Sequence, residues 1–105
     1  MEAAANPTVE QVREALTRVQ DPELNIDIVS LGLIYGVEIV DGKAKITMTL
    51  TGPGCPLGPI IQAQAHNECT KIPGISGVEI ALVWQPPWDP YTMASEDARI
   101  HLGIF

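Results

Sequence analysis

The sequence predicts a two-layer α+β domain, in which helices pack on one face of a three-stranded sheet in the order α-β-β-α-β-α. Two observations lead to this prediction. Apolar residues recur at helical spacing over residues 8–20 and 57–71. Over residues 43–51 they alternate with polar residues, as in a strand with one buried face. The alternation predicts a core on one side of the sheet, and the helices supply the layer that covers it.

The first helix is predicted by its cap and by its apolar stripe. Thr8 and Gln11 have the spacing of a capping box. The stripe consists of Val9, Val12, Leu16 and Val19. Asp21-Pro22 ends the helix because the residue before proline avoids the α region. Residues 24–34 are then expected to form a loop with a short turn.

A hairpin is predicted for residues 34–40 and 43–51 because Asp41-Gly42 between them is a strong turn signal. The buried face of its second strand is expected to consist of Ala44, Ile46, Met48 and Leu50. The polar face is expected to consist of Lys45, Thr47, Thr49 and Thr51.

The second half of the chain is predicted to add a helix, a strand and a helix. The first of these helices covers residues 57–71, and Pro73-Gly74 follows it as a stop signal. The strand covers residues 77–84, and Ser95 and Gly103 are the expected ends of the last helix. The apolar face of this half consists of Ile61, Ala65, Cys69, Ile72, Val78, Ile80, Leu82 and Trp84.

Length and charge restrict the class of protein. The 105 residues suffice for one domain, and we expect a core over residues 9–103 and a flexible segment over residues 1–7. No apolar run approaches the ~20 residues that span a bilayer, and the N-terminus lacks the features of a signal peptide. A cytoplasmic location is therefore expected. The net charge of −7, with only six Lys and Arg residues, argues against nucleic acid as a partner.

The segment Gly52-Pro53-Gly54-Cys55-Pro56 is the main candidate site. It lies between a predicted strand and a predicted helix, and its glycines and prolines restrict the backbone to special conformations. If the helix begins at Pro56, Cys55 is its N-cap residue, and the helix dipole favours a thiolate there. A thiolate binds metals and attacks electrophiles. The alternative is that Cys55 is a small apolar residue at a tight junction.

Cys69 is expected to be a buried residue of the second helix. A helix that separates it from Cys55 by 14 residues places the two roughly 20 Å apart. A disulfide requires Cα atoms within about 7 Å. The same separation prevents both thiols from binding one metal ion within a monomer.

Several stretches together resemble one family. They are Asp21-Pro22-Glu23, residues 28–35, residues 47–51 with Gly54-Cys55-Pro56, residues 84–88, and residues 95–99 with Leu102-Gly103. In this order they resemble the iron–sulfur cluster assembly domain family, which includes SufT-type and PaaD-type proteins, over about residues 9–103. The resemblance implies an accessory factor in iron–sulfur cluster assembly, or in cluster transfer to client apoproteins, and not an enzyme.

The resemblance also implies site residues, cargo and partners. The signature polar positions of the family correspond to Asp21, Glu23 and Cys55. The implied cargo is an iron–sulfur cluster or iron. Zinc is possible as well, because a site that mixes oxygen and sulfur ligands suits zinc or iron better than magnesium or calcium. Because a cluster takes about four protein ligands, a lone thiolate holds it only transiently, or shares it with a client or across a homodimer. The implied partners are scaffold proteins, client apoproteins and a separate P-loop ATPase carrier, since the chain has no Walker A motif.

Neighbouring residues have roles that the sequence leaves open. Asp21 and Glu23 are either oxygen ligands that converge with Cys55 or parts of a solvated Asx turn. Thr49 and Thr51 either support the site through their hydroxyls or occupy the solvent face of the strand. Gly54 and Pro56 are expected to support the site by shaping the loop around Cys55. Trp88 and Tyr91 are candidates for docking a partner; the alternative for Trp88 is that it fixes the proline-rich loop.

Three other functions are weighed against cluster assembly. In an enzyme Cys55 would act as a nucleophile, which requires a general base that neither histidine supplies nearby in the sequence. Gly74-Ile75-Ser76-Gly77 matches the loop of RNA-binding KH domains, but it lacks basic residues and the chain is acidic. The third alternative is an adaptor between proteins in which Cys55 never contacts a metal.

Overall fold

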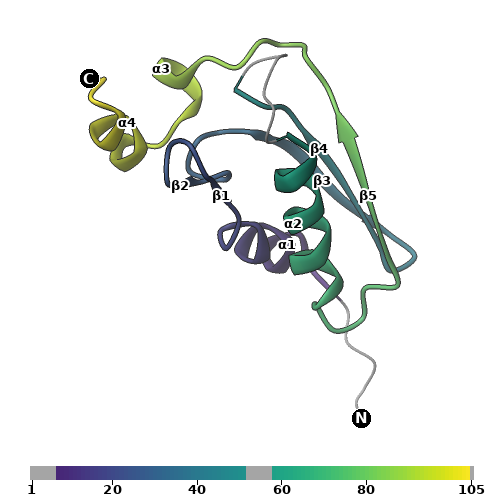
Figure 1. Cartoon of the computed structure of the whole chain (residues 1–105). Coiled ribbons are helices and arrows are strands. Elements are labelled where there is room, and N and C mark those ends of the chain that lie inside the picture. The colour runs from purple at the N-terminus through teal and green to yellow at the C-terminus, as the bar shows by residue number, and fades with distance from the viewer. Residues whose placement is uncertain (1–6, 52–57, 105) are drawn as a thin grey trace.

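The central sheet has three strands in the order β3-β4-β5 (Figure 1). The computed structural model describes residues 7–51 and 58–104. β4 (Lys43–Met48) lies in the middle, where it pairs antiparallel with β3 (Ile34–Val40) and parallel with β5 (Gly77–Leu82). The predicted hairpin and the predicted third strand are therefore confirmed.

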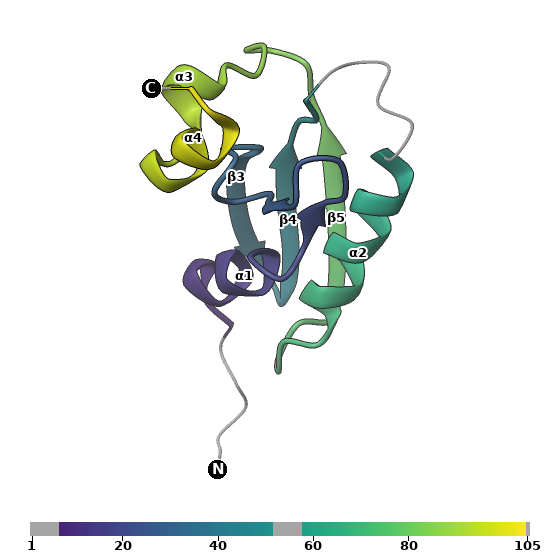
Figure 2. The same ribbon diagram turned by 60° about the vertical axis from the view of Figure 1, so that its left-hand side comes forward.

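Two helices cover one face of this sheet, as predicted. α1 (Val9–Leu16) contacts β3, α2 (Gly58–Thr70) contacts β5, and the two helices contact each other. Figure 2 shows both helices in front of the three strands. α2 also lies in the crossover connection that a parallel pair of strands requires. The two-layer α+β prediction is confirmed.

The register of the strands explains which side chains form the core. Residues that pair across neighbouring strands point to the same face of the sheet, and three such rows face the helices. The rows are Ile39, Ala44 and Val78; Val37, Ile46 and Ile80; and Ile34, Met48 and Leu82. They pack with buried helix residues, namely Val12, Ala15, Leu16, Ile61, Ala65 and Cys69. The alternation predicted for the second strand is thus confirmed up to Met48.

The prediction fails where the second strand ends. The strand stops at Met48 rather than at residue 51, and Thr49 is buried rather than on the solvent face. The Thr49 N–H donates to the Leu33 carbonyl at 2.9 Å, so one hydrogen bond continues past the end of the strand. The buried Thr49 hydroxyl donates to the Leu50 carbonyl at 3.5 Å.

α1 is shorter than the helix predicted over residues 8–20. Its capping box is confirmed, because Thr8 Oγ1 accepts from the Gln11 N–H at 3.1 Å and Gln11 Oε1 accepts from the Thr8 N–H at 2.9 Å. The helix stops early because β1 (Gln20–Asp21) pairs antiparallel with β2 (Ile26–Asp27). This small hairpin was not predicted, since a strand of two residues is too short to show a periodic pattern.

The last two helices, α3 (Pro90–Met93) and α4 (Glu96–Leu102), lie beyond the end of the sheet (Figure 1). The predicted ends of α4 are confirmed: the Ser95 side chain accepts a backbone N–H of the first turn, and Gly103 adopts a φ of 78°. α3 was not predicted and is a single turn whose N-cap is Asp89. In the two described ranges, no helix combines the length and apolarity needed to cross a membrane.

β5 ends at Leu82, two residues before the predicted end of the strand. Trp84 therefore lies outside the strand, and its side chain is exposed rather than part of the buried face. Val78, Ile80 and Leu82 pack against the core as predicted.

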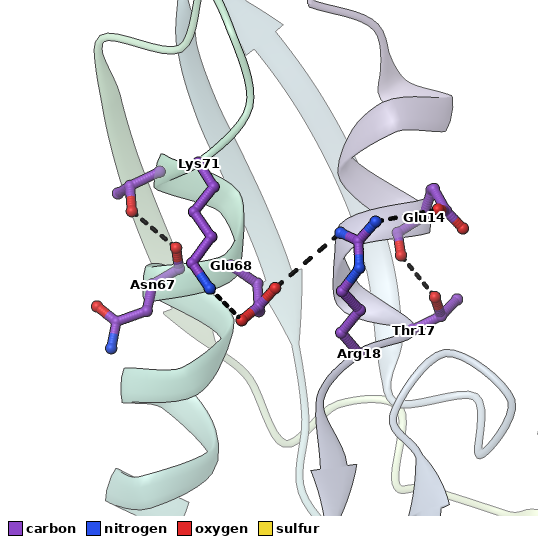
Figure 3. Close-up of polar contacts among 7 residues, drawn as sticks. Glu14, Thr17, Arg18, Asn67, Glu68 and Lys71 are labelled. Carbon is purple, nitrogen blue, oxygen red and sulfur yellow. Dashed lines mark hydrogen bonds and ion pairs between the residues drawn. The ribbon is translucent and has the colours of Figure 1, made fainter.

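Charged side chains link α1 and α2 at the surface (Figure 3). Glu68 on α2 pairs with Lys71 at 2.9 Å and with Arg18 at 4.0 Å. Arg18 also pairs with Glu14 at 3.3 Å. Because the side chains of Arg18 and Lys71 are 57% and 69% exposed, each pair contributes at most about 1 kcal/mol. The two helices are therefore held mainly by their buried apolar side chains.

Gly32 and Gly103 have similar backbone angles but differ in how closely other atoms surround them. Gly32 has a φ of 82°, and a Cβ there would lie 2.6 Å from the carbonyl carbon of Met93. Gly103 has a similar φ of 78°, but a Cβ added there would meet no atom within 4 Å. We expect Gly103→Ala to cost about 1 kcal/mol of unfolding free energy, for the left-handed backbone alone. Gly32→Ala should cost about 1–3 kcal/mol more, because the backbone of Met93 must move. Urea denaturation measures the free energy of unfolding of both variants. Equal losses in the two would contradict the close packing of Gly32 against Met93.

The Cys69 thiol gives the stability of the fold a pH dependence. Burial, and secondarily the Glu68 carboxylate, raise the pKa of Cys69 from 9.0 to about 11. The unfolded state therefore loses its proton first, so the stabilisation is complete below pH 9 and is lost as the pH rises through 11. We expect urea denaturation of the wild type to show this loss, about 2 kcal/mol over that window. Cys69→Ala should have a lower free energy of unfolding at neutral pH, but this free energy should fall less between pH 9 and 11 than in the wild type. An equal fall in both proteins would show that the pH dependence does not come from Cys69.

Candidate functional site

Three segments of the chain meet at one edge of the sheet, which we call the exit edge. β4 and β5 are parallel, so both end there, and β3 begins there because it runs antiparallel to β4. Two hydrogen bonds extend the pairing past the strands: Thr49 N–H to the Leu33 carbonyl and Val83 N–H to the Met48 carbonyl, both 2.9 Å. The exit edge therefore joins residues 31–33, 49–51 and 83–88.

The proline-rich loop that follows β5 is fixed to the exit edge by two side chains. The Trp88 Nε1–H donates to the carbonyl of Leu31 at 2.7 Å, and the Tyr35 hydroxyl donates to the carbonyl of Pro86 at 2.7 Å. Burial raises the pKa of Tyr35, although its hydrogen bond with Thr49 partly offsets this effect. Trp88 therefore does fix the loop, which is the alternative that the sequence left open for it.

The turn between β1 and β2 carries the two acidic residues that the sequence singled out. Asp21 is 1% exposed, and its Oδ1 accepts from the N–H groups of Glu23 and Leu24 at 2.8 and 3.3 Å. This is the Asx turn expected as one of the two alternatives. The buried Asp21 side chain shapes the turn, and the neighbouring Glu23 is exposed.

Glu23 lies in a hollow of about 370 Å³ together with two other predicted residues. We call it the Glu23 hollow. Its lining consists of Glu23, Leu24, Thr51, Trp88, Pro90, Leu102 and Ile104. The fold thus brings together a candidate ligand, Glu23, a candidate supporting residue, Thr51, and a candidate docking residue, Trp88. Apart from Glu23 and Thr51, the lining is apolar or aromatic.

The other predicted site residues have different positions. Cys55, Gly54 and Pro56 lie outside the described residues, and Thr51 is the last described residue before them. Tyr91 is 60% exposed and does not line the hollow. Among residues 7–51 and 58–104, no group of three or more His, Cys, Asp or Glu side chains is placed to hold a metal ion.

A second hollow, of about 500 Å³, lies between α1 and α2. Its lining consists of Arg18, Gln64, Asn67, Glu68, Thr70 and Lys71. It contains none of the predicted site residues, and its charged groups pair with one another (Figure 3). The polar lining and the mutual pairing make it a surface groove between two helices rather than a ligand site.

Sequence reasoning missed several residues that build the site. Tyr35 and Met93 hold the loop and α3, since the Met93 sulfur lies 3.6 Å from the Tyr35 hydroxyl and accepts from the Asp89 N–H at 3.3 Å. Leu102 and Ile104 reach the hollow from the end of α4. No local pattern marks them, because their position depends on how α4 packs beside the segment after β2, where the Ser95 N–H donates to the Ser30 carbonyl at 2.7 Å.

Comparison with known proteins identifies the family. The iron-sulfur cluster assembly protein family matches residues 9–82. The chain is 47% identical to the Fe-S protein maturation auxiliary factor YitW of Bacillus subtilis, over 90% of this chain and 93% of that protein. It is 48% identical to the Fe-S protein maturation auxiliary factor SufT of Staphylococcus aureus, over 82% and 98%. The crystal structure of a DUF59 domain from Bacillus anthracis superposes with a TM-score of 0.84 at 40% identity, over 91% and 92%. The chain belongs to the iron–sulfur cluster assembly protein family.

Proposed function

We propose that this protein is an accessory factor that helps to assemble iron–sulfur clusters or to transfer them to client apoproteins, with Cys55 as a transient contact for the metal, the cluster or the client. One observation carries the proposal. Glu23, Thr51 and Trp88 line a single hollow, and Thr51 directly precedes the segment that contains Cys55. The two relatives described above, which are named Fe-S protein maturation auxiliary factors, support the same class of function.

The cluster is proposed as cargo rather than as a resident cofactor. A cluster takes about four protein ligands, whereas the described side chains at the hollow supply one carboxylate, Glu23, and one hydroxyl, Thr51. The missing ligands would come from a partner, from the client or from a second copy of the chain. Cys55 and Glu23 would suit iron or zinc better than magnesium or calcium, because a thiolate is a soft ligand. Asp21 remains a candidate ligand, and its contacts with the turn support a positioning role.

The proposal includes a cytoplasmic setting and a set of protein partners. In the cytoplasm thiols stay reduced, which a transient thiolate contact requires. The proposed partners are a scaffold protein, a P-loop ATPase carrier and the client apoproteins. Acyl or group transfer is not proposed, because a nucleophilic Cys55 would need a positioned base, and His66 and His101 are exposed residues of α2 and α4.

An adaptor that never contacts metal is the second candidate function. It is favoured by one observation: most of the Glu23 hollow is apolar, and the exposed ring of Tyr91 belongs to the same C-terminal region. Such a surface fits a protein partner whether or not Cys55 binds metal.

Anaerobic reconstitution with iron and sulfide separates the two functions. We expect the wild type, alone or with an apoprotein client, to take up iron and sulfide, and Cys55→Ala to lose most of this uptake because a thiolate ligand is missing. Visible absorbance and metal analysis provide the measurement.

Cys69→Ala is the matched control, because it removes the buried thiol of α2 and leaves Cys55 in place. It should take up as much iron as the wild type. Uptake that survives Cys55→Ala, or that is lost equally in both variants, would contradict the role of Cys55. No uptake by the wild type, even with a client, would favour the adaptor.

A further inference from the structure

Ionisable side chains are distributed unevenly in this protein. Residues 20–31 and 84–104 contain six carboxylates but only one guanidinium. The carboxylates belong to Asp21, Glu23, Asp27, Asp89, Glu96 and Asp97, and the guanidinium belongs to Arg99. The other five Lys and Arg residues lie elsewhere in the chain. Residues of the β1–β2 hairpin and of α4 line common hollows, and Figure 1 shows the hairpin on the same side of the molecule as α3 and α4; we call this part of the molecule the acidic end.

The Glu23 hollow lies at the acidic end and is lined mainly by apolar side chains. A volume of about 370 Å³ is near the small end of the roughly 300–1,000 Å³ range of ligand pockets, and it suits one or two large side chains. Ile104 also lines a neighbouring hollow of about 200 Å³ on α4, together with Glu96, Arg99 and Ile100. The Ile100 side chain is 55% exposed. The apolar surface therefore continues from the Glu23 hollow along α4.

We propose that the Glu23 hollow receives a large apolar side chain from a partner polypeptide that carries Lys or Arg directly beside it. The apolar lining favours an apolar anchor, since buried anchors in pockets supply most of the binding energy at protein interfaces. The Glu23 carboxylate in the hollow and the Glu96 carboxylate in the neighbouring one favour a basic neighbour and repel an acidic one. This inference rests on the proposed function for the existence of a partner, and it adds the chemistry by which that partner is recognised.

A second copy of this chain fits the hollow less well than a basic partner does. Arg18 and Lys71 already pair with Glu68. Lys45 lies in register between Glu38 and Glu79 on the open face of the sheet. Three of the six Lys and Arg residues therefore already lie beside carboxylates of their own molecule.

Selection from a random dodecapeptide library displayed on phage tests the proposal with the full-length protein and EDTA present. We expect selected peptides to be enriched in Lys or Arg next to Leu, Ile, Phe or Trp. A selected peptide, labelled with a dye, should bind more weakly as salt rises, because its cation lies at an exposed rim. When the peptide binds, the nuclear magnetic resonance shifts of the protein's backbone amides should change most at Glu23, Leu24, Thr51 and Ile104.

Two variants and a matched control examine the two halves of the recognition. Glu23→Lys should lower the affinity for the selected peptide by about tenfold. Glu79→Lys makes the same charge change on the open face of the sheet and should lower the affinity by less than about twofold. Ile104→Ser should lower the affinity without any change of charge. Thermal denaturation establishes that each variant is folded.

Several outcomes would overturn the proposal. They are a selection without basic residues, equal effects of Glu23→Lys and Glu79→Lys, or wild-type self-association that Glu23→Lys abolishes. Cys55→Ala keeps this test separate from the proposed function. Peptide binding that persists in Cys55→Ala, while iron uptake is lost, supports both proposals; normal iron uptake without peptide binding overturns only this one.

Discussion

The parallel pairing of β5 with β4 is the constraint on which the rest of the structure depends. Parallel neighbours cannot be joined by a tight turn, so the chain must cross the sheet through α2 and return. The crossover places one apolar face over the sheet and brings the ends of β4 and β5 to the same edge. The amino end of β3 lies at this edge as well, because β3 is antiparallel to β4. One pairing choice thus creates both the core and the exit edge.

The two ends of the molecule are stabilised by different interactions. Below the exit edge, three apolar rows of the sheet meet the buried faces of α1 and α2, and the surface pairs around Glu68 add little. At the exit edge, specific hydrogen bonds hold the loops, above all those from Trp88 to Leu31 and from Tyr35 to Pro86. The buried Asp21 carboxylate plays the same part for the β1–β2 turn. The polar groups that shape the site are therefore largely buried or bonded, and Glu23 is left exposed beside an apolar hollow.

The sequence predicts features that depend on neighbouring residues and misses those that depend on distant ones. The capping box of Thr8 and Gln11, the hairpin turn and the buried stripe with Cys69 are local patterns, and all three are confirmed. The positions of Thr49 and Trp84 were predicted wrongly because the end of each strand depends on pairing between segments far apart in the chain. The Glu23 hollow was equally invisible, since its lining comes from four separate segments. The resemblance to the family named Glu23 and Cys55, but only the fold relates Glu23 to Thr51 and Trp88.

Contact with metal or cluster at the exit edge, beside Cys55, is the proposal on which the function depends. Nuclear magnetic resonance of the ¹⁵N-labelled protein with substoichiometric Co(II), a paramagnetic ion that thiolates bind, locates such a contact. We expect broadening of the backbone amides of Glu23 and Thr51 and of the Trp88 indole N–H, with the amides of Arg18 and Lys71 little affected. Cys55→Ser should abolish the effect. Broadening centred on the groove between α1 and α2, or unchanged broadening in Cys55→Ser, would contradict a metal contact at the exit edge.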